Sequence, residues 1–288
     1  MSQGLNVKPA AGKLGILTPG MGAVASTFIA GVIASRKGLR LPIGSVTQLG
    51  HIRLGKRTEN RQPLIKNFVP ITGLDNIEFG GWDIFEDSVY KAAMTSGVLP
   101  KDLLDEIKDE LDAVKPMPAV FDNYYVKKLE GTHVKKGANK MELAEQLMAD
   151  METFKKEKGC DRLVMVWCGS TEIFLKPTEV HQTVEAFEEG LRSNHPDIAP
   201  SMIYAYAAIK MGVPYANGAP NLSADFPALE QLSKETGTPT MGKDFNTGQT
   251  RIKTILAPGF KARLVGMSGR LSTNILRNPD GEALDDPV

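Results

Sequence analysis

The segment from Lys13 to Arg36 constrains the fold of this chain more than any other. A short apolar run is followed by a turn of small residues at 19–23, and then by apolar residues at helical spacing from Val24 to Ile33. This order predicts a strand, a tight turn and a helix. In such a unit the first turn of the helix offers backbone N–H groups without intrahelical partners, at the positive end of the helix dipole. The sequence therefore predicts a place where a pyrophosphate can bind.

Small residues at three positions of this turn form a GxGxxA pattern: Gly20, Gly22 and Ala25. The two glycines let a ligand approach the backbone, and the small third residue lets the helix pack closely on its strand. A glycine-rich turn that only reverses the chain is the alternative interpretation.

The usual companion of this pattern is an acidic residue about 20 residues further on, at the end of the second strand, where it holds a ribose. We predict the second strand at 42–48, and it ends in Gln48 without a carboxylate. A ribose contact would then come from Ser45, Thr47, Gln48 or elsewhere in the chain. The missing carboxylate argues against an ordinary dehydrogenase.

Composition excludes several other classes of function. The chain has 288 residues, enough for one large or two ordinary domains, and its 34 basic and 34 acidic residues cancel without a basic block. We therefore expect no binding to nucleic acid or to an anionic membrane. The longest apolar stretch, 28–34, is too short to cross a bilayer, and the polar N-terminus predicts a cytoplasmic protein.

The cysteines and histidines suggest neither a disulfide nor a zinc site. Cys160 and Cys168 lie at opposite ends of a predicted strand at 162–167, so we expect them not to pair. The four histidines are scattered at no spacing that would suit a metal.

Strands and helices alternate through the rest of the chain to about residue 240. We predict helices at 101–114, 141–158, 178–192, 201–210 and 228–236, and strands at 82–84, 162–167 and 213–218. The methionine-rich face of the helix at 141–158 is expected to pack in the core. This alternation predicts an α/β fold with a doubly wound, mostly parallel sheet.

Ligands of such a sheet collect at the carboxyl ends of its strands. Gly20, Asp83, Ser170 and Gly218 are predicted to lie there. Asp83 could contact a cofactor or, equally, join Asp87 in capping the helix that follows. The basic segment 51–66 could bind phosphate, although a solvated loop is the favoured interpretation.

The last part of the chain, 241–288, has a different character. Asp244 and Thr247 read as turn and cap residues before a helix from about residue 250, followed by a strand at 262–267 and a polar turn at 278–281. So short a region cannot bury a core of its own, and we expect it to need a partner or more chain.

Nine blocks occur in order and together resemble the inositol-3-phosphate synthases, also called myo-inositol-1-phosphate synthases. They are KLGILTPGMGAVASTFIAGV, PIGSVTQ, IRLGKRTEN, FGGWDIFED, KPMPAVFD, RLVMVWCGSTE, PSMIYAYAAI, NGAPN and GKDFNTGQT. The resemblance covers nearly the whole chain. It implies an enzyme that isomerises D-glucose 6-phosphate to inositol phosphate with a tightly held NAD: carbon 5 is oxidised, carbon 6 closes on carbon 1, and the ring ketone is reduced.

The resemblance also implies a division of the chain. Residues 1–240 would form a Rossmann-like NAD-binding domain, and 241–288 would begin a second α/β domain that carries catalysis and builds a homotetramer. Cofactor contacts are implied at Gly20, Met21, Gly22, Ala23, Val24, Asp83, Cys168, Gly169, Ser170, Thr171, Gly218, Ala219, Asp244, Thr247, Asn278 and Asp280.

Catalytic positions are implied at Asp244, Lys253 and residue 246, where the family usually has lysine and this chain has Asn246. A neutral amide can donate a hydrogen bond but brings no positive charge. Family members continue beyond the position of Val288, so we expect a chain truncated at its C-terminus.

Two hypotheses of function follow from these features. The chain is a working NAD-dependent synthase, or it is an impaired relative that binds NAD or a full-length partner without turnover. An unrelated NAD-dependent oxidoreductase would leave the ordered blocks accidental.

Overall fold

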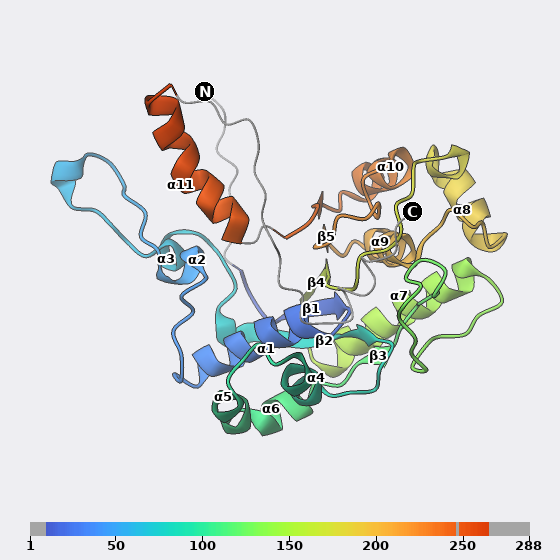
Figure 1. Ribbon diagram of the computed structural model, residues 1–288, viewed down its shortest axis with the longest axis horizontal. Coiled ribbons are helices and arrows are strands. Elements are labelled where there is room, and N and C mark those ends of the chain that lie inside the picture. Colours follow the sequence, from blue (N-terminus) through green and yellow to red (C-terminus); the bar gives the residue numbers. More distant parts are fainter. Residues whose placement is uncertain (1–9, 246–247, 265–288) are drawn as a thin grey trace.

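A parallel β-sheet forms the centre of the molecule (Figure 1). The computed structural model describes residues 10–245 and 248–264. Its strands are β1 (Leu14–Pro19), β2 (Ile77–Asp83), β3 (Met117–Pro118), β4 (Arg162–Trp167), β5 (Tyr215–Asn217) and β6 (Thr240–Met241). They pair in parallel in the order β3-β2-β1-β4-β5-β6, so the strand order reverses direction at β1 and β4. Crevices at such a reversal bind ligands in open α/β sheets.

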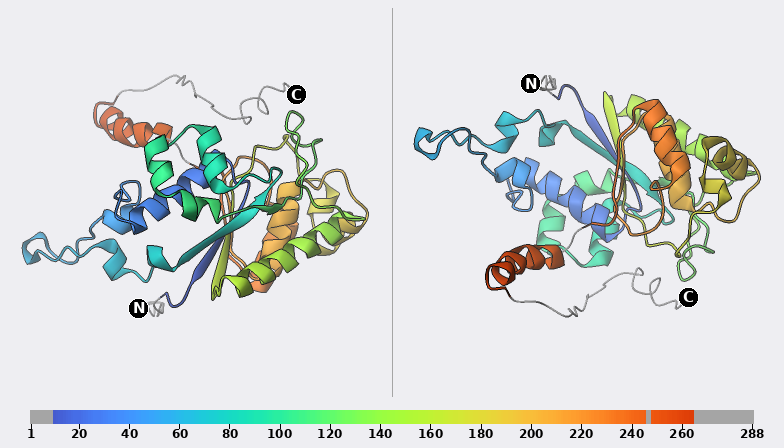
Figure 2. Two further views of the ribbon diagram at one scale, coloured as in Figure 1. Left: turned by 90° about the horizontal axis from the view of Figure 1, so that it is seen from below. Right: turned by 90° about the horizontal axis from the view of Figure 1, so that it is seen from above.

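Helices cover both faces of the sheet (Figure 2). One face carries α1 (Ala23–Arg36), α4 (Val89–Ser96), α5 (Lys101–Glu106) and α6 (Lys108–Asp112). The other carries α7 (Lys140–Glu157), α8 (Val184–Arg192), α9 (Pro200–Lys210) and α10 (Pro227–Thr236). Neighbouring strand residues point to opposite faces, and Ile16 joins the core beneath α1 while Leu17 joins the core beneath α9. The predicted doubly wound α/β fold is confirmed.

Residues 42–48 do not form the predicted second strand. A long excursion between α1 and β2 holds two short helices, α2 (Val46–Leu49) and α3 (Ile65–Phe68), and two 3-10 turns, η1 (Arg57–Glu59) and η2 (Leu74–Asn76). Ile43 and Val46 in this excursion are 82% and 71% exposed. An inner strand of a parallel sheet is buried on both faces, and these side chains are not. The second strand is β2, which ends at Asp83.

Two of the predicted helices are each divided into two elements. The segment predicted as one helix at 101–114 is interrupted at Ile107 between α5 and α6. The segment at 178–192 consists of the 3-10 turn η3 (Glu179–His181) and α8, because Thr183 begins a new helix by accepting a hydrogen bond from the Ala186 N–H. The expected cap Asp87 is also wrong, since the neighbouring Ser88 caps α4.

The α9 helix runs through the interior, with every residue from Pro200 to Ile209 buried. It packs between the sheet, α7 and α10. On α7, the predicted core face is confirmed by buried Ala144, Leu147 and Met151. The predicted buried strand at 162–167 is also confirmed as β4. These elements hold the carboxyl ends of β4 and β5 in place.

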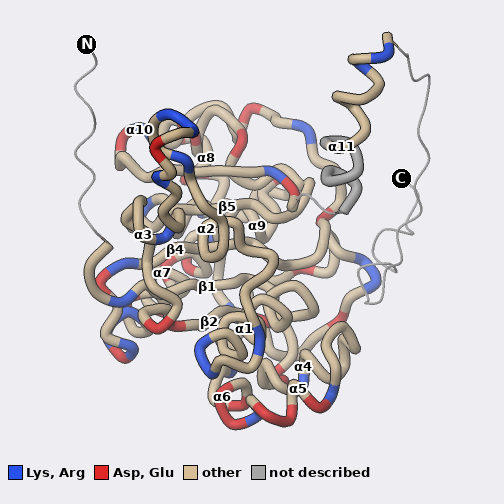
Figure 3. The backbone as a smooth tube through the Cα atoms, turned by 90° about the vertical axis from the view of Figure 1, so that its left-hand side faces the viewer, with Lys and Arg blue, Asp and Glu red and all other residues tan. Residues whose placement is uncertain are grey.

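Helix α11 (Gly248–Ala262) stands apart from the two helical layers (Figure 1). It confirms the predicted helix from about residue 250. Because α11 extends through Ala262, the predicted strand cannot begin there, and its remainder from 265 lies outside the described residues together with the turn at 278–281. Within the described ranges, none of the helices is both long enough and apolar enough to cross a membrane. Figure 3 shows Lys and Arg interspersed with Asp and Glu along the described chain.

Candidate cofactor site

The turn between β1 and α1 leaves the start of the helix bare. Gly20 has φ +82°, and a Cβ added there would lie 2.4 Å from the Gly169 Cα, so only glycine fits. Gly22 is the N-cap residue of α1, which has no side-chain cap and no acidic residue in its first turn. A Cβ at Gly22 would meet nothing within 4 Å. The first N–H groups of α1 are therefore accessible to an anion.

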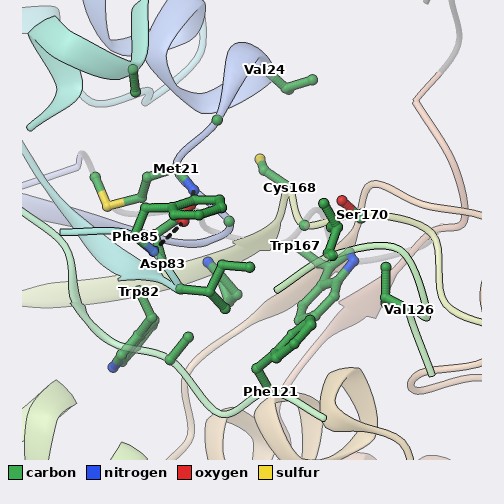
Figure 4. Close-up of a pocket in the computed structure, with 18 of the residues that line it drawn as sticks. Met21, Val24, Trp82, Asp83, Phe85, Phe121, Val126, Trp167, Cys168 and Ser170 are labelled. Carbon is green, nitrogen blue, oxygen red and sulfur yellow. Dashed lines mark hydrogen bonds between the residues drawn. The ribbon is translucent and has the colours of Figure 1, made fainter. Parts of the chain in front are cut away.

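A cleft lies directly in front of this turn, at the carboxyl edge of β1, β2 and β4 (Figure 4). It encloses about 1230 Å³ of empty space, part of it open to solvent. The predicted residues that line it are Gly20, Met21, Gly22, Ala23, Val24, Asp83, Cys168, Gly169 and Ser170. The structure thus brings three of the four predicted strand ends to one opening.

The loop after β4 lies against the β1–α1 turn. Its first residue, Cys168, donates its backbone N–H to the Pro19 carbonyl over 2.9 Å. Burial raises the pKa of the Cys168 thiol to about 12, so the thiol stays protonated near neutral pH and is no nucleophile. Cys160, beyond the other end of β4, is also a free thiol.

Asp83 supplies the carboxylate that the sequence analysis expects after the second strand and does not find at Gln48. It is the last residue of β2, the parallel neighbour of β1. Its Oδ2 accepts the Met21 N–H over 2.6 Å, and its Oδ1 accepts the Phe85 N–H over 3.1 Å. Burial raises the pKa of Asp83, and these N–H bonds oppose the rise. The carboxylate lines the cleft and also holds the turn, while Ser45, Thr47 and Gln48 do not line the cleft.

A second group of predicted residues meets beside the cleft without lining it. The Gly218 N–H donates to the Trp167 carbonyl over 3.1 Å, and the Asp244 N–H donates to the Ala219 carbonyl over 3.1 Å. The loop after β6 therefore packs on the loop after β5. Thr171 follows the lining residues but is not among them.

Four of the predicted positions lie outside the described residues: Asn246, Thr247, Asn278 and Asp280. Lys253 lies in α11, but its side chain is outside the described part of the structure. The catalytic roles of Asp244, Asn246 and Lys253 stay predictions.

Sequence reasoning missed the apolar end of the cleft. Trp82, Trp167 and Tyr204 line it, with both tryptophan rings edge-on to Tyr204 at centroid distances of 5.4 and 5.6 Å. The loop after β3 adds further lining residues: Ala119, Val120, Phe121, Val126 and Leu129. Strand β3 has two residues, too few for any periodicity, so only the block KPMPAVFD could have marked this loop.

Glu172 was also missed as a lining residue, although it stands in the block that ends in STE. It is 5% exposed and lies directly after the predicted loop 168–171. The sequence signal that could have found it is a carboxylate close behind the continuous apolar run of β4.

These residues fit a dinucleotide. The uncapped start of α1 suits a pyrophosphate, the carboxylate of Asp83 suits a ribose hydroxyl, and the aromatic and aliphatic end suits a flat ring. In addition, the Trp167 Nε1 is buried and has no hydrogen-bond partner among the described residues. A buried donor without a partner in a cleft indicates a place for a ligand acceptor.

Comparison with known proteins agrees with this geometry. The family model described as myo-inositol-1-phosphate synthase, an NAD-binding domain, matches residues 14–279. Inositol-3-phosphate synthase 1 of Bacteroides thetaiotaomicron is 51% identical over 98% of this chain and 65% of its own length. Isozyme 1 of Arabidopsis thaliana is 30% identical over 96% of this chain and 57% of its own length.

The same likeness holds in three dimensions. The crystal structure of inositol-3-phosphate synthase from Caenorhabditis elegans matches 88% of this chain and 53% of its own, with a TM-score of 0.78 and 26% identity. The chain therefore spans between about half and two thirds of the length of these relatives.

Proposed function

The chain belongs to the myo-inositol-1-phosphate synthase family, and from this premise we propose that it binds NAD in the cleft at the carboxyl edge of β1, β2 and β4. The observation that carries the proposal is the uncapped start of α1, which opens on the cleft through Gly22, Ala23 and Val24. A dinucleotide carries its negative charge at the pyrophosphate, and this is the chemistry that a bare helix N-terminus binds.

Each lining residue has a proposed part in holding the cofactor. The N–H groups of residues 22–24 hold the pyrophosphate. Asp83 fixes Met21, and because a carboxylate has about four lone-pair sites it can also accept a ribose hydroxyl. Cys168, Gly169 and Ser170 form the wall that faces this turn.

Further cofactor contacts are proposed from the family resemblance: Thr171, Gly218, Ala219, Asp244, Thr247, Asn278 and Asp280. The division into an NAD-binding part, 1–240, and the start of a catalytic and oligomerisation part, 241–288, is proposed on the same ground.

We further propose that the reaction is the family's conversion of D-glucose 6-phosphate to 1D-myo-inositol 3-phosphate. Bound NAD would accept a hydride from the sugar and return it later. The chain's own residues bind and orient: Lys253 donates to a developing oxyanion or to the phosphate, and Asp244 stands beside the loop 218–219. The homotetramer of the family is proposed for the whole protein.

Binding without turnover is the second candidate, and Asn246 favours it. Loss of one charge-assisted donor at a developing oxyanion costs roughly 10²–10³ in rate. Under this candidate the chain holds NAD, or a full-length partner, and forms no product.

Two measurements separate these proposals. Isothermal titration of the chain with NAD at pH 8 is expected to show saturable binding, and the variant Gly22→Ala is expected to bind more weakly because its Cβ occupies the approach to α1. Absence of binding in the unmodified chain contradicts the cofactor proposal. Incubation with glucose 6-phosphate and NAD then tests turnover: inositol phosphate supports the synthase, and its absence together with NAD binding supports the second candidate.

A further inference from the structure

Glu172 is held by neutral donors from two elements that are distant in sequence. The Ser201 N–H donates to its Oε1 over 2.8 Å, and the Ser201 hydroxyl donates to its Oε2 over 2.5 Å. The Asn221 amide donates to the same Oε2 over 3.1 Å and to the Ser201 Oγ over 3.0 Å. All three side chains are buried.

This cluster joins two of the loops in which the family resemblance implies cofactor contacts. Glu172 follows residues 168–171 in the loop after β4, and Asn221 lies in the loop after β5. Inside the second loop, the Asn217 amide donates to the Asn221 carbonyl over 2.8 Å, and the Ala219 N–H donates to the Asn217 Oδ1 over 3.0 Å. One carboxylate thus connects the wall of the cleft to Gly218 and Ala219.

The third member of the cluster fixes the carboxylate to a rigid support. Ser201 is the second residue of α9, so its N–H is one of the first-turn groups without an intrahelical partner. A negative charge at this end of a helix is favoured by the helix dipole. The two loops are therefore anchored to a helix that is buried from Pro200 to Ile209.

We propose that Glu172 is a positioning residue: through Ser201 and Asn221 its negative charge sets the two cofactor loops, so that NAD binds tightly only when this carboxylate is ionised. The inference rests on the proposed binding of NAD. Glu172 acts through the loops and is not assigned a contact with the reacting atoms.

The protonation state of Glu172 decides how many of these bonds can form. A carboxylate accepts from all three donors, but a carboxylic acid has a hydrogen on one oxygen and can no longer do so. Burial raises the pKa of Glu172 to about 7, against the opposing effect of the bonds from Ser201 and Asn221. The titratable groups that face it are the phenols of Tyr125, Tyr204 and Tyr215, and burial raises the pKa of each, so they stay neutral near pH 7.

The first test is the dissociation constant for NAD between pH 6 and pH 8, measured by titration calorimetry on the whole chain. If only the ionised form binds well, the apparent affinity falls with the ionised fraction, to roughly one tenth between pH 8 and pH 6. An affinity that is constant over this range overturns the proposal.

The variant Glu172→Gln removes the charge and keeps the shape. Its amide cannot accept from all three donors, so we expect roughly tenfold weaker NAD binding at pH 8. We also expect the pH dependence to be lost, which a purely structural role would not produce. The matched control is Glu179→Gln at an exposed position, which should keep the wild-type affinity and pH profile. Wild-type behaviour of Glu172→Gln overturns the proposal.

The variant Ser201→Ala decides the question if Glu172→Gln does not fold. It removes one hydrogen bond that favours the ionised form of Glu172. The pH at which the NAD affinity is half of its maximum should therefore move to a higher value. An unmoved midpoint contradicts the proposal.

Amide hydrogen exchange without NAD gives a second readout of the same cluster. Residues 168–171 and 217–221 should exchange faster in Glu172→Gln than in the wild type, and unchanged exchange contradicts the proposal. If the wild-type chain does not bind NAD at pH 8, the proposed function fails, and the link to the cofactor fails with it. If it binds and Glu172 has no influence, only the present inference fails.

Discussion

The two halves of the cleft are built in different ways. On the β1 and β2 side, Asp83 accepts the backbone N–H of Met21, which lies 62 residues earlier in the chain, and that of Phe85, two residues later. On the β4 and β5 side, Glu172 accepts from Ser201 and Asn221, which are 29 and 49 residues further along the chain. The first carboxylate is held by main-chain donors alone, and the second is held mainly by side-chain donors in a buried network. Substitutions on the two sides should therefore differ in their effects on stability and in the pH dependence of these effects.

The largest effect is expected where the halves touch. Gly20→Ala forces a side chain into a left-handed conformation and places its Cβ 2.4 Å from the Gly169 Cα. We expect the free energy of unfolding in urea to fall by more than about 2 kcal/mol, with loss of NAD binding. Gly22→Ala is the matched control, because a Cβ there meets nothing within 4 Å and should change stability by less than about 1 kcal/mol. Equal stability of the two variants would show that the backbones of Gly20 and Gly169 are not in close contact.

The next effect belongs to the buried network and depends on pH. Burial raises the pKa of Glu172 from its ordinary value of 4.5 to about 7 in the folded chain, so the folded state holds this proton more tightly. Its contribution to stability is fully present below about pH 4.5 and is lost as the pH rises through 7.

Urea denaturation of the wild type and Glu172→Gln at pH 5 and pH 8 measures this contribution. The stability of the wild type relative to the variant should fall by about 3 kcal/mol from pH 5 to pH 8. A difference that stays constant with pH would show that this carboxylate does not titrate in the range. If the difference falls as expected, protonation stabilises the fold while it loosens the cofactor loops, so stability and NAD affinity change in opposite directions with pH.

A smaller effect is expected from Asp83→Asn on the β1 and β2 side of the cleft. The amide cannot accept both the Met21 and Phe85 N–H groups as the carboxylate does, and we expect a loss of about 1–2 kcal/mol in unfolding free energy. Hydrogen exchange should accelerate at 20–24 and stay unchanged at 217–221. Acceleration in both segments would mean that the two halves form one cooperative unit.

The smallest effect is expected at Cys168, on the seam between the halves. Cys168→Ala should cost no more than about 1 kcal/mol and leave NAD affinity within about twofold. Because the pKa of the thiol is raised to about 12, a thiol reagent at pH 8 should label Cys168 slowly in the folded chain and rapidly in urea. Rapid labelling of the folded chain would show a thiolate and an open loop.

The strand, turn and helix of 13–36, the alternating α/β order, the buried strand β4 and the family could all be predicted along the chain. The single elements rest on patterns within one segment, such as the small residues of the turn, the apolar run of β4 or the methionine-rich face of α7, and the family rests on nine blocks in order. Periodicity and turn chemistry are local properties, and local properties can be read along the chain.

The choice of the segment that pairs with β1, and with it the place of the acidic residue, depends on contacts between distant parts of the chain. Residues 42–48 look like a strand, but in the described part of the chain they pair with no strand, and Ile43 and Val46 are exposed, whereas Ile77–Trp82 pairs with β1. Glu172 gained its partners in the same way, from a helix start and a loop that the fold brings to it. Strand pairing and buried hydrogen bonds are contacts between distant segments, so no periodicity within one segment records them.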